Sequence, residues 1–271
     1  MEKIRNKKYR KTGRTGDLEI SAMGIGTWAF DPKGWTGTTD DESVRVLREA
    51  LDMGINLIDT APVYGLGHSE RIVGKAIGGY DREDIFIATK CGLIWDEEGR
   101  VENNLSRESL LKEIDEILGR LETEYVDLLQ VHWPNPAYDI KETFETLAEI
   151  KASGKARYIG VSNYSLEDLK RAEELCEITS FQGLYNMLEP NASSYHNIGL
   201  GYRSEEEILP YTGERGMIFL LYSPLMQGIL AGAGADNIDR LTEGDVRRTN
   251  PVLGEEKYYR AAEEIEKIAM E

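Results

Sequence analysis

Cysteine is scarce in this 271-residue chain, which contains only Cys91 and Cys176. Two cysteines so far apart do not provide the disulfide framework of a small secreted protein, and their spacing is not that of a metal site. We therefore expect a reducing compartment, free thiols and no bound metal.

Basic residues are too few to balance the acidic ones: 32 Lys and Arg stand against 49 Asp and Glu, a formal net charge of -17. Such a charge disfavours nucleic acid or an anionic membrane as the main partner. A phosphate-bearing ligand must then be held by local backbone N–H groups and a few well-placed cations.

Long apolar segments are missing as well. No run reaches the roughly 18 residues of a membrane span. The basic segment of residues 1–18 lacks the apolar centre of a signal peptide. These absences predict a cytoplasmic protein that does not enter the membrane.

What the sequence does contain is a regular alternation of strand and helix patterns. Strand-like segments begin near residues 23, 56, 84, 126, 156, 180 and 217, with amphipathic segments between them, which is typical of a parallel sheet. The first strand ends in Gly24-Ile25-Gly26-Thr27 and not in GxGxxG, so the pattern favours a (β/α)8 TIM-barrel type of α/β fold over a doubly wound sheet. We expect one domain over residues 1–271, with an N-terminal β-hairpin in residues 1–22 that turns at residues 13–17. Asp40 or Asp41 and then Ser69 are expected to cap the first two helices.

The barrel is expected to be incomplete. After Tyr222 come a polar, Gly-rich loop, residues 228–251, and one charged helix from about Gly254, with no pattern for an eighth strand. Because a closed barrel needs eight strands, we expect seven strands without the last βα unit. The first and seventh strands would keep unpaired edges, which predicts self-association or recruitment of a partner.

Three of the predicted strands end on an ionisable residue: Asp59, Lys90 and His132. Tyr64 follows Asp59 after a loop that Pro62 stiffens. If the strands are parallel, these four side chains meet at the end of the sheet where α/β folds place their chemistry.

The chemistry of these four residues suits proton donation to a carbonyl. A tyrosine has a pKa near 10, too weak an acid at neutral pH without help. Lys90 would supply a positive charge, Asp59 would hold that ammonium, and His132 would bind the substrate oxygen.

Amide and hydroxyl groups follow the remaining strands, at Ser162, Asn163, Gln182 and Tyr222. They suit a carboxamide and a flat ring, which together describe a nicotinamide. Trp28, Trp35, Trp95 and Trp133 fall near the same sheet end and predict an apolar pocket. Each residue alone has a structural alternative, as a helix cap, solvated charge or packing aromatic, and only the joint placement favours function. We interpret His68 and His196 as structural.

The sequence resembles the aldo-keto reductases over essentially the whole chain. The motifs that carry the resemblance are Met23-Gly-Ile-Gly-Thr-Trp28, Leu57-Ile-Asp-Thr-Ala61 with Tyr64-Gly65, Ala88-Thr-Lys90, Val131-His132-Trp133, Ile159-Gly-Val-Ser-Asn163, Gln182 with Tyr185-Asn186, and Tyr222-Ser-Pro-Leu225 with Gly228. The resemblance implies NAD(P)H-dependent reduction of small aldehydes or ketones.

The resemblance also implies roles for single residues. Tyr64 would be the general acid, tuned by Lys90 and Asp59, and His132 would orient the carbonyl. The cofactor residues that it implies are Gly26, Thr27, Trp28, Ser162, Asn163, Gln182 and Tyr222, and around the pyrophosphate Ser223, Pro224, Leu225 and Gly228. Trp28, Trp95 and Trp133 would line the substrate pocket.

The expected cofactor is NADP(H), with NAD(H) as the alternative. In the family, the eighth strand and the helix after it hold much of the adenosine and its 2′-phosphate, and no residue here corresponds to them. The chain would then be a fragment, receive the unit from elsewhere, or bind the cofactor poorly. Two other functions stay open: a truncated relative that binds nucleotide or a partner without catalysis, and a lyase or aldolase that forms a Schiff base on Lys90.

Overall fold

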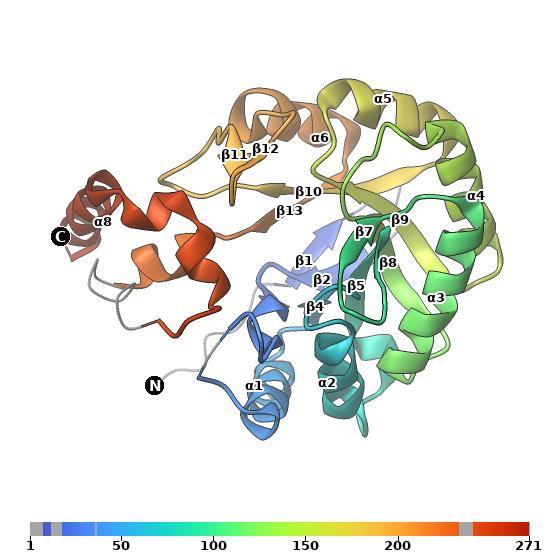
Figure 1. Ribbon diagram of the computed structural model, residues 1–271, viewed down its shortest axis with the longest axis horizontal. Coiled ribbons are helices and arrows are strands. Elements are labelled where there is room, and N and C mark those ends of the chain that lie inside the picture. The colour runs from blue at the N-terminus through green and yellow to red at the C-terminus, as the bar shows by residue number, and fades with distance from the viewer. Residues whose placement is uncertain (1–7, 12–17, 36, 233–240, 271) are drawn as a thin grey trace.

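The computed structural model describes residues 8–11, 18–35, 37–232 and 241–270. Its centre is a seven-stranded sheet in the order β13-β10-β9-β8-β5-β4-β3, and every neighbouring pair is parallel. The expected fold is therefore confirmed as a nearly closed (β/α) barrel with seven strands (Figure 1). The strands are β3 (Gly24–Gly26), β4 (Leu57–Asp59), β5 (Phe86–Cys91), β8 (Val126–Val131), β9 (Ala156–Ser162), β10 (Ile178–Leu184) and β13 (Ile218–Tyr222).

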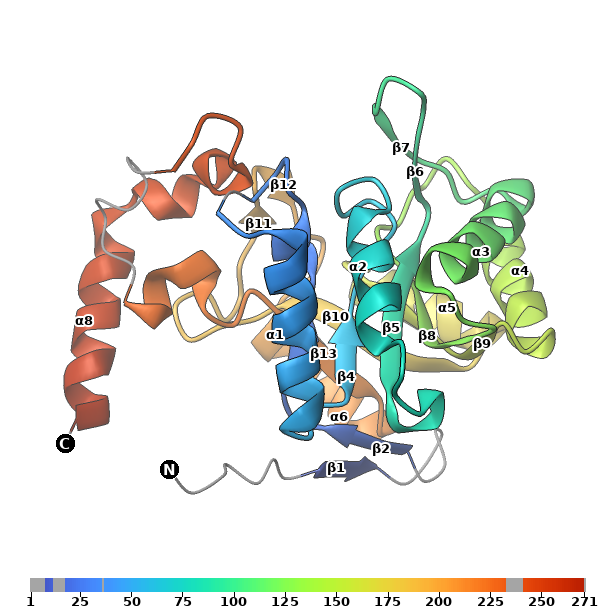
Figure 2. The ribbon, with the colours of Figure 1, turned by 90° about the horizontal axis from the view of Figure 1, so that it is seen from below.

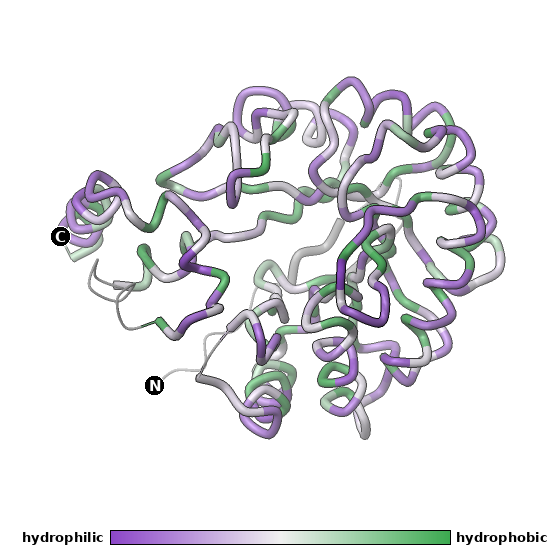
Figure 3. The backbone as a smooth tube through the Cα atoms, viewed as in Figure 1, coloured by the Kyte–Doolittle hydropathy of each residue, from purple (hydrophilic) through white to green (hydrophobic). Residues whose placement is uncertain are grey.

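Helices follow the strands and cover the outside of the sheet (Figures 1 and 2). They are α1 (Asp40–Asp52), α2 (His68–Ile77), α3 (Arg107–Leu121), α4 (Ile140–Ala152), α5 (Leu166–Leu175) and α6 (Leu209–Arg215), the last preceded by a π-helical turn at Ser204–Ile208. In Figure 3 the central strands are mostly coloured as hydrophobic, whereas the helices alternate between the two ends of the scale. That alternation is the pattern of helices with one face on a core and one in water.

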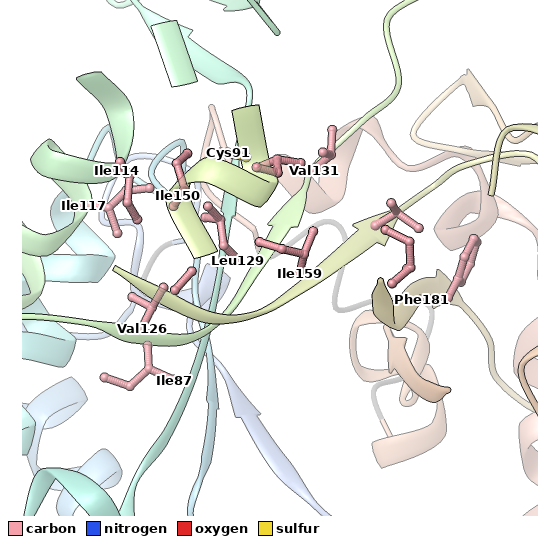
Figure 4. Packing of buried hydrophobic residues seen from close by; sticks show 14 of the residues in the cluster. Ile87, Cys91, Ile114, Ile117, Val126, Leu129, Val131, Ile150, Ile159 and Phe181 are labelled. Atoms are coloured by element: carbon pink, nitrogen blue, oxygen red, sulfur yellow. The ribbon is translucent and has the colours of Figure 1, made fainter. Parts of the chain in front are cut away.

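The two faces of the central strands pack differently. On β5, Ile87 and Cys91 face outward into the main core with Ile114 and Ile117 of α3 (Figure 4). Phe86 and Ala88 instead belong to a smaller cluster inside the barrel. Because side chains alternate along a strand, Lys90 shares the inward side with Phe86 and Ala88. The alternation of β5 thus turns a lysine into the barrel.

The expected N-terminal hairpin is present as β1 (Lys8–Lys11) and β2 (Leu18–Ser21), which pair antiparallel, while its predicted turn lies outside the described residues. Figure 2 shows the hairpin below the barrel. Ser21 ties it to the sheet, because its N–H donates to Asn56 Oδ1 at 2.7 Å and its hydroxyl accepts from the Leu57 N–H at 3.3 Å. Ile20 joins the inner cluster, so the hairpin closes this end of the barrel.

Both predicted helix caps were wrong. Thr39 caps α1 through a capping box with Glu42, because Asp40 and Asp41 are already in the first turn. Helix α2 begins after Gly67, which has a φ of 84°. Ser69 is buried inside α2, and its hydroxyl donates to the Thr27 carbonyl at 3.0 Å. This bond fixes α2 to the end of β3.

Three segments differ from the sequence prediction. Two hairpins were not anticipated: β6 (Leu93–Trp95) with β7 (Val101–Asn103), and β11 (Ser194–Tyr195) with β12 (Ile198–Gly199). The segment after β13 is not a plain loop, since it contains 3-10 turns at Met226–Ala231, Val246–Thr249 and Pro251–Gly254 before helix α8 (Glu256–Met270). Met226, Ile229, Leu253 and Tyr258 form a small core of their own there. Figure 1 shows α8 standing apart from the barrel helices.

Candidate active site

Asp59, Lys90 and His132 lie at the carboxyl ends of three neighbouring strands. Asp59 is the last residue of β4 and pairs in register with Ala88 of β5. Lys90 is the next inward residue of β5, and His132 follows β8, where its N–H donates to the Cys91 carbonyl at 3.0 Å. Tyr64 reaches the same place from the turn after β4. The structure thus brings the four predicted side chains together at one end of the barrel.

The ammonium of Lys90 is the centre of this group. It donates to Asp59 Oδ1 at 2.9 Å and Oδ2 at 3.1 Å, to the Thr60 carbonyl at 2.9 Å and to Tyr64 Oη at 3.2 Å. An ammonium has three hydrogens, so the two Asp59 oxygens share one of them. Lys90 is only 1% exposed, and its position is fixed by these contacts.

Lys90 is positively charged at neutral pH. Burial by itself lowers the pKa of the ammonium, but the charge of Asp59 and the contact with Tyr64 outweigh burial, and the pKa stands above its usual value. The phenol of Tyr64 therefore has a charged ammonium beside it.

The pKa of Tyr64 depends on burial and on both neighbouring charges. Burial raises the pKa of the phenol above 10, the Lys90 charge lowers it, and the Asp59 charge raises it further, so that the net shift is upward. Asp59 therefore does not make the phenol more acidic; it holds the lysine that does. The phenol keeps its proton at neutral pH and is available as a donor.

The imidazole of His132 lies edge-on to the Tyr64 ring, with 5.9 Å between the ring centroids. Burial and the nearby Lys90 charge hold the pKa of His132 well below 6.5, so the ring is neutral. Its Nδ1 is buried and has no hydrogen-bond partner among the described residues. A neutral imidazole has one nitrogen that can donate and one that can accept, so His132 can bind a polar substrate atom.

The predicted amide group lies beside these residues, at the ends of β9 and β10. Gln182 donates from Nε2 to Asp59 Oδ2 at 2.8 Å. The Asn163 amide donates to the His132 carbonyl and to Ser162 Oγ, each at 3.1 Å. These contacts join the amide side chains directly to the group around Lys90.

Tyr222, at the end of β13, closes the far side of the amide group. Its hydroxyl donates to Asn163 Oδ1 at 2.9 Å, and the hydroxyl of Tyr202 donates to the same atom at 3.1 Å. Sequence reasoning missed Tyr202, because the residue lies between two predicted elements with no pattern around it. Burial raises the pKa of both tyrosines, which keeps them protonated as donors.

The model of the Aldo/keto reductase family matches residues 22–271. The chain belongs to the aldo/keto reductase family. It is 37% identical over 266 residues to the aldo-keto reductase YhdN of Bacillus subtilis, covering 96% of this chain and 76% of that relative. It is 36% identical over 232 residues to the NADH-specific methylglyoxal reductase of Escherichia coli, covering 80% of this chain and 68% of that relative. Among solved structures, the glycerol dehydrogenase AKR11B4 of Gluconobacter oxydans has a TM-score of 0.78 and 35% identity, with 96% of this chain and 78% of that chain covered.

As an aldo/keto reductase, the protein is an oxidoreductase of small carbonyl compounds from a family that uses nicotinamide cofactors. The expected family is thereby confirmed. Within the described part of the chain, no group of three or more His, Cys, Asp or Glu side chains could hold a metal, and no helix is long and apolar enough to cross a membrane.

The tryptophans of the predicted apolar pocket of this aldo/keto reductase lie only partly next to Asp59, Tyr64, Lys90 and His132, the four residues called the tetrad below. Trp28 stacks on Tyr64 with 6.1 Å between centroids, and Trp35 meets Trp28 edge-on at 5.5 Å. Trp133 directly follows His132, and its carbonyl accepts from Asn103 Nδ2 at 3.2 Å. Trp95 lies in the β6–β7 hairpin, with the Arg120 guanidinium 5.5 Å from its ring. Trp95 and Trp133 as substrate contacts stay predictions.

Two side chains of the β11–β12 hairpin pack around Trp28, and sequence reasoning did not assign them to the site. Tyr195 and His196 lie 6.4 and 5.7 Å from the Trp28 ring, and Tyr195 meets Tyr222 edge-on at 5.3 Å. His196 thus lies beside the site, and its structural role stays a prediction. His68 contacts Asp40 at 2.9 Å near the start of α2, a contact that fits a structural role.

Proposed function

We propose that the protein is an NAD(P)H-dependent reductase of aldehydes or ketones in which Tyr64 is the proton donor. The observation that supports this most strongly is the chain of contacts from Asp59 through Lys90 to the Tyr64 hydroxyl. The phenol carries the proton, the ammonium of Lys90 places a fixed positive charge beside it, and the carboxylate of Asp59 fixes that charge. Together they suit donation of a proton to a substrate oxygen.

The raised pKa of Tyr64 is compatible with this role. Reduction of a carbonyl places negative charge on its oxygen, and an alkoxide is a much stronger base than a phenolate. The phenol therefore gives up its proton when that charge develops, and the ammonium of Lys90, 3.2 Å from Oη, stabilises the phenolate that remains. Neutral His132 lies beside the same ring and would hold the substrate oxygen.

The residues around the tetrad fit a nicotinamide. Ser162, Asn163 and Gln182 are buried polar side chains that match a carboxamide, and Tyr222 adds an aromatic ring. The buried Thr27 Oγ1 at the end of β3 has no partner among the described residues, so one further hydroxyl is available there. When bound, the reduced nicotinamide supplies the hydride. Gly26, Thr27 and Trp28 would contact the same cofactor, and Ser223, Pro224, Leu225 and Gly228 would surround its pyrophosphate.

NADPH and NADH are both cofactor candidates, since one relative is described as NADH-specific. The test is a titration of each cofactor, followed by quenching of tryptophan fluorescence, and then cofactor oxidation with carbonyl substrates. Methylglyoxal is the first substrate to test for reduction, and glycerol with the oxidised cofactor for the reverse direction, because two relatives are named for these compounds. Substrate-dependent turnover supports the proposal, and its absence at saturating cofactor would favour a binding protein without catalysis.

A Schiff base on Lys90 is the less suitable function. An amine must lose its proton to attack a carbonyl, and Asp59 and Tyr64 together hold the pKa of Lys90 above its usual value even though burial lowers it. Borohydride trapping of a carbonyl compound on Lys90 would favour the Schiff-base function over carbonyl reduction.

A further inference from the structure

The loop of residues 223–228, which follows β13, has an unfavourable backbone. Ser223, Met226 and Gln227 have φ values of 53°, 45° and 50°, in the left-handed region that side chains other than glycine rarely adopt. Left-handed residues other than glycine persist where the surrounding structure holds them, and they gather at functional sites. Side chains from other segments hold this loop.

Both ends of the Gln227 amide are bound to other segments. Its Nε2 lies 3.1 Å from Tyr195 Oη and 2.8 Å from His196 Nε2, and its Oε1 accepts from Asn250 Nδ2 at 2.9 Å. Because Nε2 has two hydrogens, it can donate to both hairpin residues, with His196 accepting at Nε2. Nδ1 of His196 then carries the proton and donates to Thr249 Oγ1 at 2.8 Å.

Tyr195 contacts the beginning of the same loop. Its hydroxyl lies 2.7 Å from Ser223 Oγ while it also accepts from Gln227. Two of the three left-handed residues are therefore bound through one phenol oxygen. The Tyr195 ring packs beside Trp28 and Tyr222, which fixes where that oxygen lies.

The hairpin that carries Tyr195 is itself tightly defined. Tyr195 pairs with Ile198, so only His196 and Asn197 form the turn, and both have positive φ values, of 48° and 63°. Two positive φ values in a two-residue turn match the twist of the flanking strands. The hairpin can thus act as a fixed support for the loop.

We propose that Tyr195 and Gln227 are positioning residues for the cofactor: their hydrogen bonds hold residues 223–228 in the shape in which the loop receives the pyrophosphate. The inference rests on the proposed function, because the resemblance to the family assigns this loop to the pyrophosphate. A loop that is held before binding loses less conformational freedom when the ligand arrives, so its affinity is higher.

The experiment compares Tyr195→Phe and Gln227→Ala with the wild-type chain, by titrating NADPH and NADH against tryptophan fluorescence. Tyr80→Phe is the matched control, since the Tyr80 hydroxyl also makes a hydrogen bond, to Asp52 at 2.9 Å, far from the loop at α1. Each of the first two variants is expected to raise the cofactor Kd about tenfold, the effect of roughly one hydrogen bond. A positioning role should appear in the Kd of the cofactor more than in kcat at saturating cofactor, because the lost hydrogen bonds act on the loop.

A third variant separates positioning from a general loss of stability. Gln227→Gly also removes the amide but relieves the left-handed strain, so its Kd should lie between those of the wild type and Gln227→Ala. Amide hydrogen exchange at residues 225–228 of the free protein should quicken in Tyr195→Phe and not in Tyr80→Phe.

The outcomes distinguish the two proposals. A wild-type chain that binds neither cofactor would overturn the proposed function and the positioning role together. Normal wild-type binding with an unchanged Kd and unchanged loop exchange in Tyr195→Phe and Gln227→Ala would overturn the positioning role alone. A loss of kcat without a change in Kd would also contradict it.

Discussion

Gln182 donates a 2.8 Å hydrogen bond to Asp59 Oδ2, although the two residues are 123 positions apart in the chain. The same carboxylate accepts from the ammonium of Lys90. Asp59 therefore connects the amide side chain of Gln182 on β10 to the lysine of β5. A change at this carboxylate should affect stability and activity together.

Asp59→Asn should lower the free energy of unfolding by about 3 kcal/mol at pH 7, because it leaves the buried Lys90 ammonium without its counter-charge. Urea unfolding measures the loss. Asp96→Asn is the control, because Asp96 pairs with Arg100 in an exposed ion pair, where about 1 kcal/mol or less is expected. Equal losses in both variants would show that Asp59 does not stabilise the buried lysine.

Tyr64→Phe should reduce kcat by about 100-fold or more, since general acid catalysis contributes factors of this size. Cofactor affinity should remain near the wild-type value, because the ring and its packing against Trp28 are kept. The measurement is steady-state turnover of a carbonyl substrate together with a cofactor titration. Near-normal kcat would remove Tyr64 from the proposed mechanism.

Glu113 should make the protein less stable as the pH rises from about 4.5 to 8. Burial raises the pKa of this carboxyl from 4.5 to about 8, although one oxygen accepts from the Gly92 N–H at 2.7 Å. In that window the folded state holds a proton that the unfolded state has lost. Stability therefore falls with rising pH, by an order of 3 to 5 kcal/mol over the window, and the effect levels off above about pH 8.

Glu113→Gln isolates this effect, because the amide oxygen can still accept from Gly92 and does not titrate. The difference in unfolding free energy between variant and wild type should grow in favour of the variant from pH 5 to pH 8. Urea unfolding at several pH values measures it. Parallel curves for the two proteins would mean that Glu113 is ionised in the folded state or not buried as described.

The outer edges of the sheet, β3 and β13, predict self-association. Leu221 on β13 is 45% exposed, so Leu221→Lys should weaken association by placing a charge on that edge. The control is Met53→Lys, which alters a 60% exposed residue just after α1. Sedimentation of all three proteins at low and high salt gives the result, with more association expected at high salt because the net charge of -17 is screened. A wild-type protein that stays monomeric throughout would contradict the prediction.

Sequence patterns alone located the strands, and thereby the ends at which Asp59, Lys90 and His132 stand. Such patterns are local: a two-residue alternation or a helical period depends on residues a few positions apart. The start of α1 shows the limit even at short range, since Thr39 and not Asp40 makes the cap. A residue caps a helix only if its own backbone is still extended, as that of Thr39 is, and the sequence does not show at which residue the helical backbone begins.

Only the tertiary structure decided how these side chains meet. It set the direction of the pKa shift of Tyr64, which is upward, because burial depends on what other segments cover the ring. It also placed Tyr202 on Asn163, and Tyr195 on Ser223 and Gln227, through contacts between residues 28 to 39 positions apart. The order of residues along this chain determined which groups stand at each strand end. Folding determined their protonation and their partners, because both depend on groups that are near in space and distant in sequence.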